Sequence, residues 1–363
     1  MGLFGKLFKK NKSKSAELLS DYKVKIKSIH PQGAGAVEVV FELSDSSLDM
    51  LPFTPGQYLN IEVSVDGKLF KRSYSICSRV GEDLAIGVRA VKDGIVSNWF
   101  NSTAKVGDEL TVSAPMGNFK MVDAGKSYVA FAAGSGITPI LSMAKSICLS
   151  QGGTLDLFYG NKTREMIMFK DELDQLNEEH VRVGYWLSQE EQEGFQQGRL
   201  SKDIVSSIIK SDLSLLKKEG FFICGPEQMI VDTLEALKTF GVPENKIHYE
   251  LFASPTLMKQ KQTKVTPSFH GVSKVIVVLD DEEIDFDLET DGATILDEAE
   301  SHAVDAPYSC RGGVCCTCKA KVLKGEVRMD SNMTLTDKEI EEGYVLTCQA
   351  HPASEEVIIS YDE

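Results

Sequence analysis

The sequence predicts a multidomain protein in which an antiparallel β-barrel is followed by an α/β domain with a parallel sheet and then by a small α+β domain. Three observations predict this order. Short alternating runs between turn residues fill residues 21–123. Apolar runs that alternate with helical segments fill residues 124–252. A group of cysteines marks the last segment, residues 273–363.

The composition is that of an ordinary globular protein. Of the 363 residues, 42% are hydrophobic and 26% are charged, which suits two or three domains. No apolar run is long enough for a membrane span. The 8 cysteines show no disulfide-like framework and we see no secretory signal, so we expect a reducing, cytoplasmic location.

Residues 1–20 form a basic N-terminal tail. The first 15 residues carry 5 lysines and place Leu3, Phe4, Leu7 and Phe8 along one face of a helix. Such a segment could make weak contact with an anionic membrane surface. A disordered tail is the alternative, because so short a helix is marginal in water.

The barrel is predicted from a series of short strands. They cover Tyr22–Ile26, Val37–Leu43, Tyr58–Val65, Leu84–Val91 and Leu110–Val112. The sequence Val65-Asp66-Gly67-Lys68 predicts a hairpin that leads into a further strand, which ends with Arg72-Ser73-Tyr74-Ser75. These last four residues offer an arginine for a phosphate, an aromatic ring to stack on a flavin and a hydroxyl to meet its reactive nitrogen.

A second part of the same site is expected downstream. Gly87-Val88-Arg89 ends a strand, and Gly94-Ile95-Val96-Ser97 opens a helix whose free amides suit a pyrophosphate. The alternative for Ser97 is simple helix capping.

The α/β domain begins with a buried strand, Tyr128–Ala133, which ends in Gly134-Ser135-Gly136-Ile137-Thr138-Pro139. Strand, glycine turn and helix form a nucleotide-binding arrangement. Further strands are expected at 154–159, 181–187, 220–224 and 246–251. Cys224-Gly225-Pro226 follows one of them, at the edge where ligands collect. Cys224 could lie beside a nicotinamide or be a buried small hydrophobe.

Residues 253–272 are interpreted as a flexible linker. Beyond it, 274–279 and 283–288 predict a hairpin, 293–301 a helix, and Thr336 with Glu339 a capping box. This is enough for a small β-grasp domain.

The cysteines of this last domain have an informative spacing. Cys310, Cys315, Cys318 and Cys348 are separated by 4, 2 and 29 residues, which is typical of plant-type 2Fe–2S ferredoxins. A structural zinc site is the alternative, although zinc modules more often pair short spacings on both sides. Cys316 would give an unsuitable spacing and is interpreted as a non-ligand.

The net charge of −15 belongs entirely to the last segment. Residues 273–363 hold 22 acids and 7 bases, whereas residues 1–272 hold 32 of each. An acidic surface around a cluster could steer a basic redox partner, or it could simply be a solvated face. Nucleic acid is a poor candidate partner.

The ordered motifs resemble the ferredoxin–NADP reductase superfamily, here with a plant-type 2Fe–2S ferredoxin domain at the C-terminus. Within it, residues 20–363 are most similar to the reductase subunits of phenylacetyl-coenzyme A epoxygenases. The resemblance implies a FAD-binding barrel in 21–123, an NAD(P)-binding domain in 124–252 and a ferredoxin domain in 273–363.

The resemblance also implies roles for single residues. Ser75, Cys224 and Glu250 would act at the reacting centre, with Ser75 near flavin N5 and Cys224 near the point of hydride transfer. The residues implied to bind FAD are Arg72, Ser73, Tyr74, Ser75, Gly87, Val88, Arg89, Gly94, Ile95, Val96, Ser97 and Phe252. Those implied to bind the pyridine nucleotide are Gly134, Ser135, Gly136, Thr138, Pro139, Gly225 and Pro226.

The choice of nicotinamide depends on the next loops. Lys162, Arg164 and Ser188 are candidates to hold a 2′-phosphate, so NADPH is favoured over NADH, although Gln189 weakens the case. The alternative for Lys162 and Arg164 is a solvated loop.

The predicted function follows from electron counting. A reduced nicotinamide gives two electrons as hydride, a flavin accepts them, and a cluster takes one at a time. We therefore expect an NAD(P)H reductase that feeds a di-iron epoxygenase-like oxygenase. Alternatives are a reductase of a Rieske or steroid-hydroxylase oxygenase, or a non-catalytic FAD and 2Fe–2S electron-relay subunit like that of dihydroorotate dehydrogenase.

Overall fold

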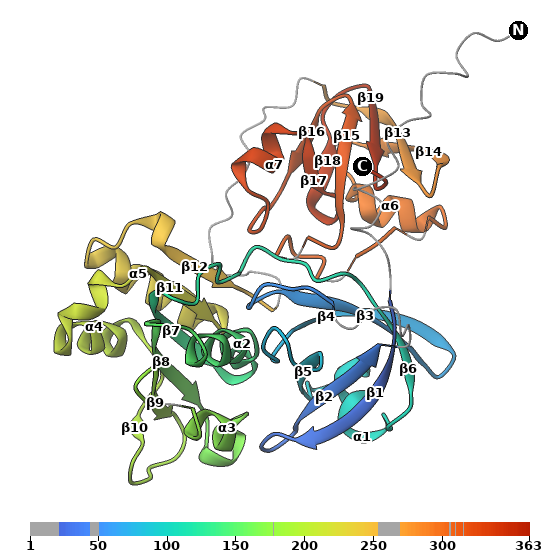
Figure 1. The fold of residues 1–363 in the computed structure, drawn as a ribbon. Coiled ribbons are helices and arrows are strands. Elements are labelled where there is room, and N and C mark those ends of the chain that lie inside the picture. Colours follow the sequence, from blue (N-terminus) through green and yellow to red (C-terminus); the bar gives the residue numbers. More distant parts are fainter. Residues whose placement is uncertain are drawn as a thin grey trace, which may run out of the picture.

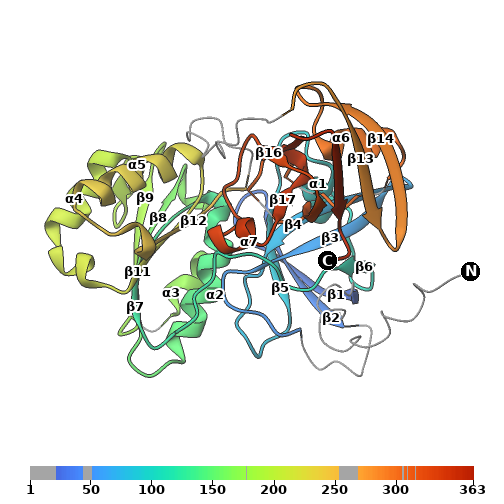
Figure 2. The same cartoon turned by 90° about the horizontal axis from the view of Figure 1, so that it is seen from above.

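The computed structural model of the protein describes residues 22–43, 51–176, 178–252, 269–304, 306–308, 310–314 and 316–363. The expected basic tail, residues 253–268 of the expected linker and the candidate ligand Cys315 lie outside this description. Figures 1 and 2 show the C-terminal unit, coloured orange to red, lying over both the barrel unit and the α/β unit. None of the described helices is both long and apolar enough to cross a bilayer.

The first unit is a six-stranded antiparallel half-barrel with strand order β4-β3-β6-β1-β2-β5, which confirms the predicted class. The predicted hairpin is confirmed, since Val65 pairs with Lys68, and Asp66 and Gly67 have φ angles of 51° and 75°. Two successive positive φ angles suit the primed turns that match strand twist. The elements are β1 (Tyr22–Pro31), β2 (Ala36–Leu43), β3 (Tyr58–Val65), β4 (Lys68–Ser75), β5 (Ala85–Arg89), α1 (Ile95–Ser102) and β6 (Glu109–Val112).

The second unit is a six-stranded parallel sheet with the order β10-β9-β8-β7-β11-β12. The middle of β7 is buried without alternation, as expected of a parallel strand covered on both faces. The strands are β7 (Ser127–Ala133), β8 (Thr154–Asn161), β9 (Val181–Leu187), β10 (Gln196–Gln197), β11 (Gly220–Cys224) and β12 (Ile247–Glu250).

The helices of this unit form two separate cores with the sheet. Helices α2 (Ile137–Cys148) and α3 (Lys170–Asp174) share one core cluster, and α4 (Lys202–Ser211) and α5 (Glu227–Thr239) share the other. Helix α2 begins at Ile137 and has Pro139 in its first turn, because the 3₁₀ turn η2 (Gly134–Gly136) leads straight into it. The carboxyl ends of the strands therefore stand between two helical layers, where ligands of such sheets bind.

The third unit is built on a five-stranded sheet with the order β14-β13-β19-β15-β17 and a two-stranded sheet, β16-β18. The predicted capping box is confirmed: the Thr336 and Glu339 side chains bond reciprocally to each other's backbone amides. The elements are β13 (Val272–Leu279), β14 (Glu282–Glu289), α6 (Ile295–Ser301), β15 (Lys319–Lys324), β16 (Val327–Met329), α7 (Asp337–Glu341), β17 (Tyr344–Leu346), β18 (Ala350–Pro352) and β19 (Glu356–Ser360).

Candidate functional site

The end of β4 brings the predicted flavin motif to the edge strand of the barrel. Residues alternate between the two faces of a strand, so Arg72 and Tyr74 share one face and Ser73 and Ser75 the other. The Tyr74 ring packs edge-on against Phe100 of α1, with ring centroids 5.6 Å apart. Ser75 is 4% exposed and lies opposite Tyr58 of β3 in the antiparallel register.

The N-terminus of α1 offers the predicted phosphate site. Asn98 N is the first amide to bond inside the helix, to Gly94 O at 3.2 Å, so the amides of Ile95, Val96 and Ser97 are not used by the helix itself. The Ser97 hydroxyl accepts from Val91 N at 3.2 Å and donates to Gly94 O at 3.4 Å. Its side chain therefore secures the turn, which leaves its amide as the group suited to an anion.

The three residues at the end of β5 lie at the boundary between the barrel and the α/β domain. Val88 is fully buried in the barrel core. A Cβ on Gly87 would stand 2.5 Å from the methyl group of Thr138. The Arg89 guanidinium donates to Met166 O, and burial lowers its pKa. Gly87 and Arg89 therefore contact the α/β domain, while the Arg89 Nε has no hydrogen-bond partner among the described residues.

The glycine turn after β7 meets the end of β11. A Cβ on Gly136 would lie 2.0 Å from Cys224 O, so only glycine fits there. Gly134 has a φ of 57°, and the Thr138 hydroxyl donates to Ser135 O at 3.0 Å. The structure thus brings the glycine turn and Cys224 together, although they are far apart in the sequence.

The other predicted nucleotide residues frame this turn. Pro139 is buried in the first turn of α2. Gly225 packs on Ala133, since a Cβ there would lie 3.1 Å from Ala133 N. Pro226 immediately precedes α5 as its N-cap residue. The helix N-termini of α2 and α5 are therefore neighbours at one edge of the sheet, an arrangement that fits a nucleotide's phosphates.

Cys224 and Glu250 are register partners on neighbouring strands. Burial raises the pKa of the Cys224 thiol, and the nearby Glu250 carboxylate adds to this. Burial also raises the pKa of Glu250 to about 8, because its carboxylate is removed from water. Its Oε2 has no hydrogen-bond partner among the described residues. Glu250 is therefore mainly a neutral acid at pH 7 and can donate a hydrogen bond or a proton.

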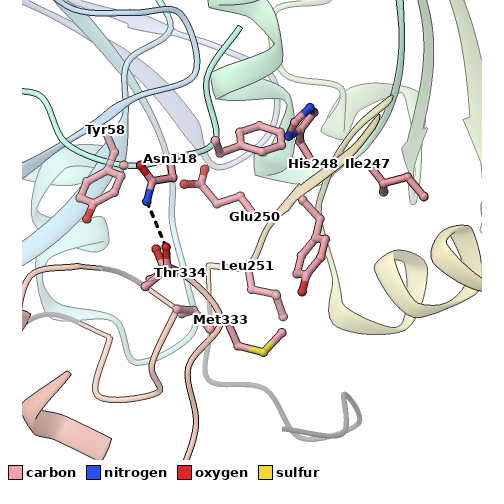
Figure 3. A pocket seen from close by; sticks show the side chains of 12 residues that line it. Tyr58, Asn118, Ile247, His248, Glu250, Leu251, Met333 and Thr334 are labelled. Atoms are coloured by element: carbon pink, nitrogen blue, oxygen red, sulfur yellow. Dashed lines mark hydrogen bonds between the residues drawn. The ribbon is translucent and has the colours of Figure 1, made fainter. Parts of the chain in front are cut away.

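Glu250 lines a cavity of about 210 Å³ at the junction of all three units. The barrel contributes Tyr58 and Asn118, β12 contributes His248 and Glu250, and the C-terminal unit contributes Met333 and Thr334. Figure 3 shows the Glu250 carboxylate directed toward Asn118, whose Nδ2 donates to Thr334 O at 3.0 Å. Phe252, also expected near the flavin, follows β12 and is 47% exposed.

The loops after β8 and β9 bring the predicted 2′-phosphate residues to one edge. Ser188 N donates to Asn161 O at 3.0 Å and Gln189 N to Lys162 O at 2.9 Å. Lys162 and Arg164 are exposed. The Glu190 carboxylate accepts from Arg164 N at 2.7 Å, so an acid shares this edge with the two cations.

Three of the four predicted cluster ligands are described, and their thiols converge. Interactions with Cys310 and Cys318 raise the pKa of Cys348, so the three sulfurs are neighbours. Gly312 N donates to Cys310 Sγ at 3.3 Å, the kind of amide–sulfur contact that a cluster loop provides. Among the described residues, no group of three or more His, Cys, Asp or Glu side chains is arranged to hold a metal ion, and the fourth predicted ligand, Cys315, lies outside them. The three thiols and the glycine-containing loop fit a 2Fe–2S cluster.

Cys316, which directly follows Cys315, contacts a residue outside this sulfur group. It is 7% exposed, and its Sγ lies 3.1 Å from Thr334 Oγ1. Burial raises the pKa of its thiol to about 11. The contact supports the prediction that Cys316 is a non-ligand.

Sequence reasoning missed the residues that join the barrel to the cysteine loop. Cys316 N donates to Tyr58 Oη at 3.1 Å, and Thr317 Oγ1 donates to Asn60 Oδ1 at 3.2 Å. Tyr58 and Asn60 belong to a predicted strand, but alternation alone does not reveal that a distant domain covers one face of it. The available signal was Asn60 between the apolar residues Leu59 and Ile61.

Three protein families match the sequence in the order of the three units. They are the oxidoreductase FAD-binding domain over residues 28–121, the oxidoreductase NAD-binding domain over 131–235, and the 2Fe–2S iron–sulfur cluster binding domain over 277–353. The matches support FAD, NAD(P)H and a 2Fe–2S cluster as cofactors.

Similar proteins match this chain over nearly its whole length. A component of 1,2-phenylacetyl-CoA epoxidase from Escherichia coli K12 is 33% identical over 93% of this chain and 96% of its own. The ferredoxin reductase component of 3-ketosteroid-9-alpha-monooxygenase from Mycobacterium tuberculosis H37Rv is 32% identical over 90% of this chain and 92% of its own.

Solved structures agree on the fold. Phthalate dioxygenase reductase superposes with a TM-score of 0.58 at 24% identity, covering 94% of this chain and 98% of that one. An intact type IV self-sufficient cytochrome P450 monooxygenase superposes with a TM-score of 0.69 at 24% identity, covering 93% of this chain but 41% of that one.

Proposed function

Because this chain belongs to the family of FAD- and 2Fe–2S-containing NAD(P)H oxidoreductases that includes a component of 1,2-phenylacetyl-CoA epoxidase, we propose that it delivers electrons from NADPH to an oxygenase component. The observation that carries the proposal is that the cysteine loop docks on strand β3 of the barrel. Thr317 of this loop bonds to Asn60, which lies two residues from Tyr58, the register partner of Ser75. Bound FAD supplies the chemistry that accepts hydride and releases single electrons.

The chain's own residues would divide this work. Arg72, the first-turn amides of α1 and Tyr74 would hold the flavin, and Ser75 would lie near its reactive nitrogen. Gly134, Gly136 and Cys224 would place the nicotinamide. Glu250, neutral at pH 7, would hold a proton close to the flavin. The three described thiols and Cys315 would hold the cluster.

NADPH is the donor we favour. Lys162, Arg164 and Ser188 share one edge of the sheet, where two cations could pair with a 2′-phosphate. Glu190 lies against the same edge and opposes this charge, which makes the preference for NADPH a modest one.

The acceptor we propose is a di-iron oxygenase of the phenylacetyl-CoA epoxygenase type. The similarity to the epoxidase component supports it. A steroid-hydroxylating oxygenase is the second candidate, since the 3-ketosteroid-9-alpha-monooxygenase component is nearly as similar. The acidic ferredoxin segment would attract a basic surface on either acceptor.

We also propose a cytoplasmic location and retain the weak membrane contact of residues 1–15 as a hypothesis. The 7 described cysteines form no disulfide with one another, which suits a reducing compartment. The membrane hypothesis predicts that deletion of residues 2–14 abolishes binding to anionic liposomes. No binding by the intact protein would exclude it.

The test of the proposed function is electron delivery to a protein acceptor. The purified holoprotein should reduce cytochrome c with NADPH, and substrate oxidation should appear when an oxygenase encoded beside its gene replaces cytochrome c. A phenylacetyl-CoA epoxidase that turns over supports the first candidate, and a steroid hydroxylase that turns over supports the second. Failure to reduce any one-electron acceptor contradicts the proposal.

A further inference from the structure

One buried amide joins the flavin motif to the cysteine loop. Asn60 of β3 is 2% exposed. Its Oδ1 accepts the Ser73 hydroxyl at 2.7 Å and the Thr317 hydroxyl at 3.2 Å. Ser73 belongs to the Arg72–Ser75 motif, and Thr317 precedes the candidate ligand Cys318 directly.

The strand geometry makes this contact possible. Asn60 and Tyr58 are two residues apart on β3 and so share a face of the strand. They lie opposite Ser73 and Ser75 in the register with β4. One face of the sheet therefore carries both serines of β4 and, beside them, the two side chains of β3 that contact the cysteine loop.

Tyr58 makes the second contact of this face. Its Oη accepts the amide of Cys316 at 3.1 Å, next to the Asn60–Thr317 bond. Tyr58 is 5% exposed, and its ring packs over Gly117, where a Cβ would lie 2.9 Å away. Two adjacent residues of the loop are thus held by two side chains of one strand.

An amide suits the position better than other side chains. A carbonyl oxygen has two lone pairs, and both hydroxyl donors use them. The Nδ2 group donates to Met116 Sδ at 3.4 Å, and Asn60 N donates to Ser113 Oγ at 3.0 Å. The oxygen and the nitrogen of this buried side chain are therefore both satisfied without a charge beside the cluster.

We propose that Asn60 is a positioning residue that sets the separation of flavin and cluster by holding Ser73 and Thr317 on one oxygen atom. The inference rests on the proposed function. The step it serves is the transfer of one electron from the reduced flavin to the oxidised cluster, in which no bond forms or breaks. Each hydride supplies two such electrons, which leave one after the other.

The experiment compares Thr317→Val, Asn60→Leu and the matched control Thr317→Ser in the holoprotein. Rapid anaerobic mixing with NADPH follows the bleaching of flavin and of cluster absorbance separately. Hydrogen exchange of the peptide that contains residues 316–318 reports docking without turnover. The electron-paramagnetic spectrum of the dithionite-reduced protein shows whether the cluster itself is intact.

Thr317→Val removes one hydrogen bond, so exchange of this peptide should rise about three- to tenfold. Asn60→Leu removes the acceptor that Ser73 and Thr317 share and should slow cluster reduction at least about tenfold relative to flavin bleaching. Thr317→Ser should retain wild-type values for both measurements. A general loss of stability would slow both bleaching phases together instead.

The outcomes separate the inference from the proposed function. If NADPH and NADH bleach neither centre in the wild type, the proposed function fails. If the wild type transfers electrons but Thr317→Val shows wild-type exchange and a wild-type ratio of the two rates, the positioning role is wrong. The Thr317→Val variant tests the positioning role of Asn60 even if the Asn60→Leu variant does not fold.

Discussion

For some single residues, the residue type and the spacing in the sequence are enough to predict a chemical role. Spacing alone predicts Cys310, Cys318 and Cys348 as ligands, and their thiols converge in the structure. The hydroxyls of Ser97 and Thr138 bond to nearby backbone carbonyls, and the role of these two residues at a cofactor stays a prediction. The spacing of residues in the sequence can place them in one turn. It does not predict the direction of each side chain, because that direction depends on the contacts made in the fold.

The ligand assignment predicts opposite outcomes for adjacent cysteines. Cys315→Ser should lose the visible and electron-paramagnetic signals of the cluster, because a fourth thiolate is required. Cys316→Ser should keep them, since its thiol contacts Thr334. Spectra and iron content of the two purified variants provide the measurement, and the reverse pattern would overturn the assignment.

Glu250 predicts a pH dependence of stability. Its pKa is about 8 in the folded chain against 4.5 in the unfolded one, so the folded chain binds the proton more tightly. The stability from this proton is complete below 4.5 and is lost as the pH rises through about 8. The thermal midpoint of the wild type should therefore fall relative to that of Glu250→Gln across this window.

Calorimetry of both proteins well below and well above pH 8 checks this. A difference between the two midpoints that stays constant with pH would show that Glu250 does not titrate as inferred.

Among the elements, the strongest sequence signals were local ones. The primed hairpin at Asp66-Gly67 and the capping box at Thr336 were both predictable, because the turn and cap chemistry lies within four residues. The short strands β15 to β19 were not predicted, since their pairing partners are distant in the sequence. The burial of Asn60 was equally unpredictable, because a separate domain causes it.

The contact between η2 and β11 makes a second prediction. Gly136→Ala places a Cβ 2.0 Å from Cys224 O, so the ends of β7 and β11 must separate. We expect a loss of about 1–3 kcal/mol in the free energy of unfolding. Gly160→Ala in β8 is the matched control, since its nearest new contact would be an ordinary 3.5 Å. Equal denaturation curves for the two variants would contradict the close approach.

The loops after β8 and β9 predict the basis of donor choice. Replacing both Lys162 and Arg164 with alanine should raise KM for NADPH about tenfold and leave KM for NADH nearly unchanged, because only NADPH carries the extra phosphate. Lys210→Ala, on α4, is the control for charge alone. Steady-state kinetics with both donors measures this. A higher kcat/KM for NADH in the wild type would end the preference for NADPH.

At the scale of the whole molecule, the barrel contacts both other units, which fits a path for electrons through all three. The barrel meets the α/β domain through Gly87 and Arg89 and meets the ferredoxin domain through Tyr58 and Asn60. All the excess negative charge lies on the ferredoxin domain, the unit that would meet the acceptor under the proposed function. The sequence order of the domains was predictable from motifs, but the surfaces by which they dock were visible only in the fold.

The most direct test of this path is an anaerobic titration of the holoprotein with NADPH, and in parallel with NADH, followed by visible and electron-paramagnetic resonance spectra. We predict bleaching of the flavin absorbance together with the appearance of the signal of a reduced 2Fe–2S cluster. Flavin bleaching without that signal, or no bleaching with either donor, would contradict a path from nicotinamide through FAD to the cluster.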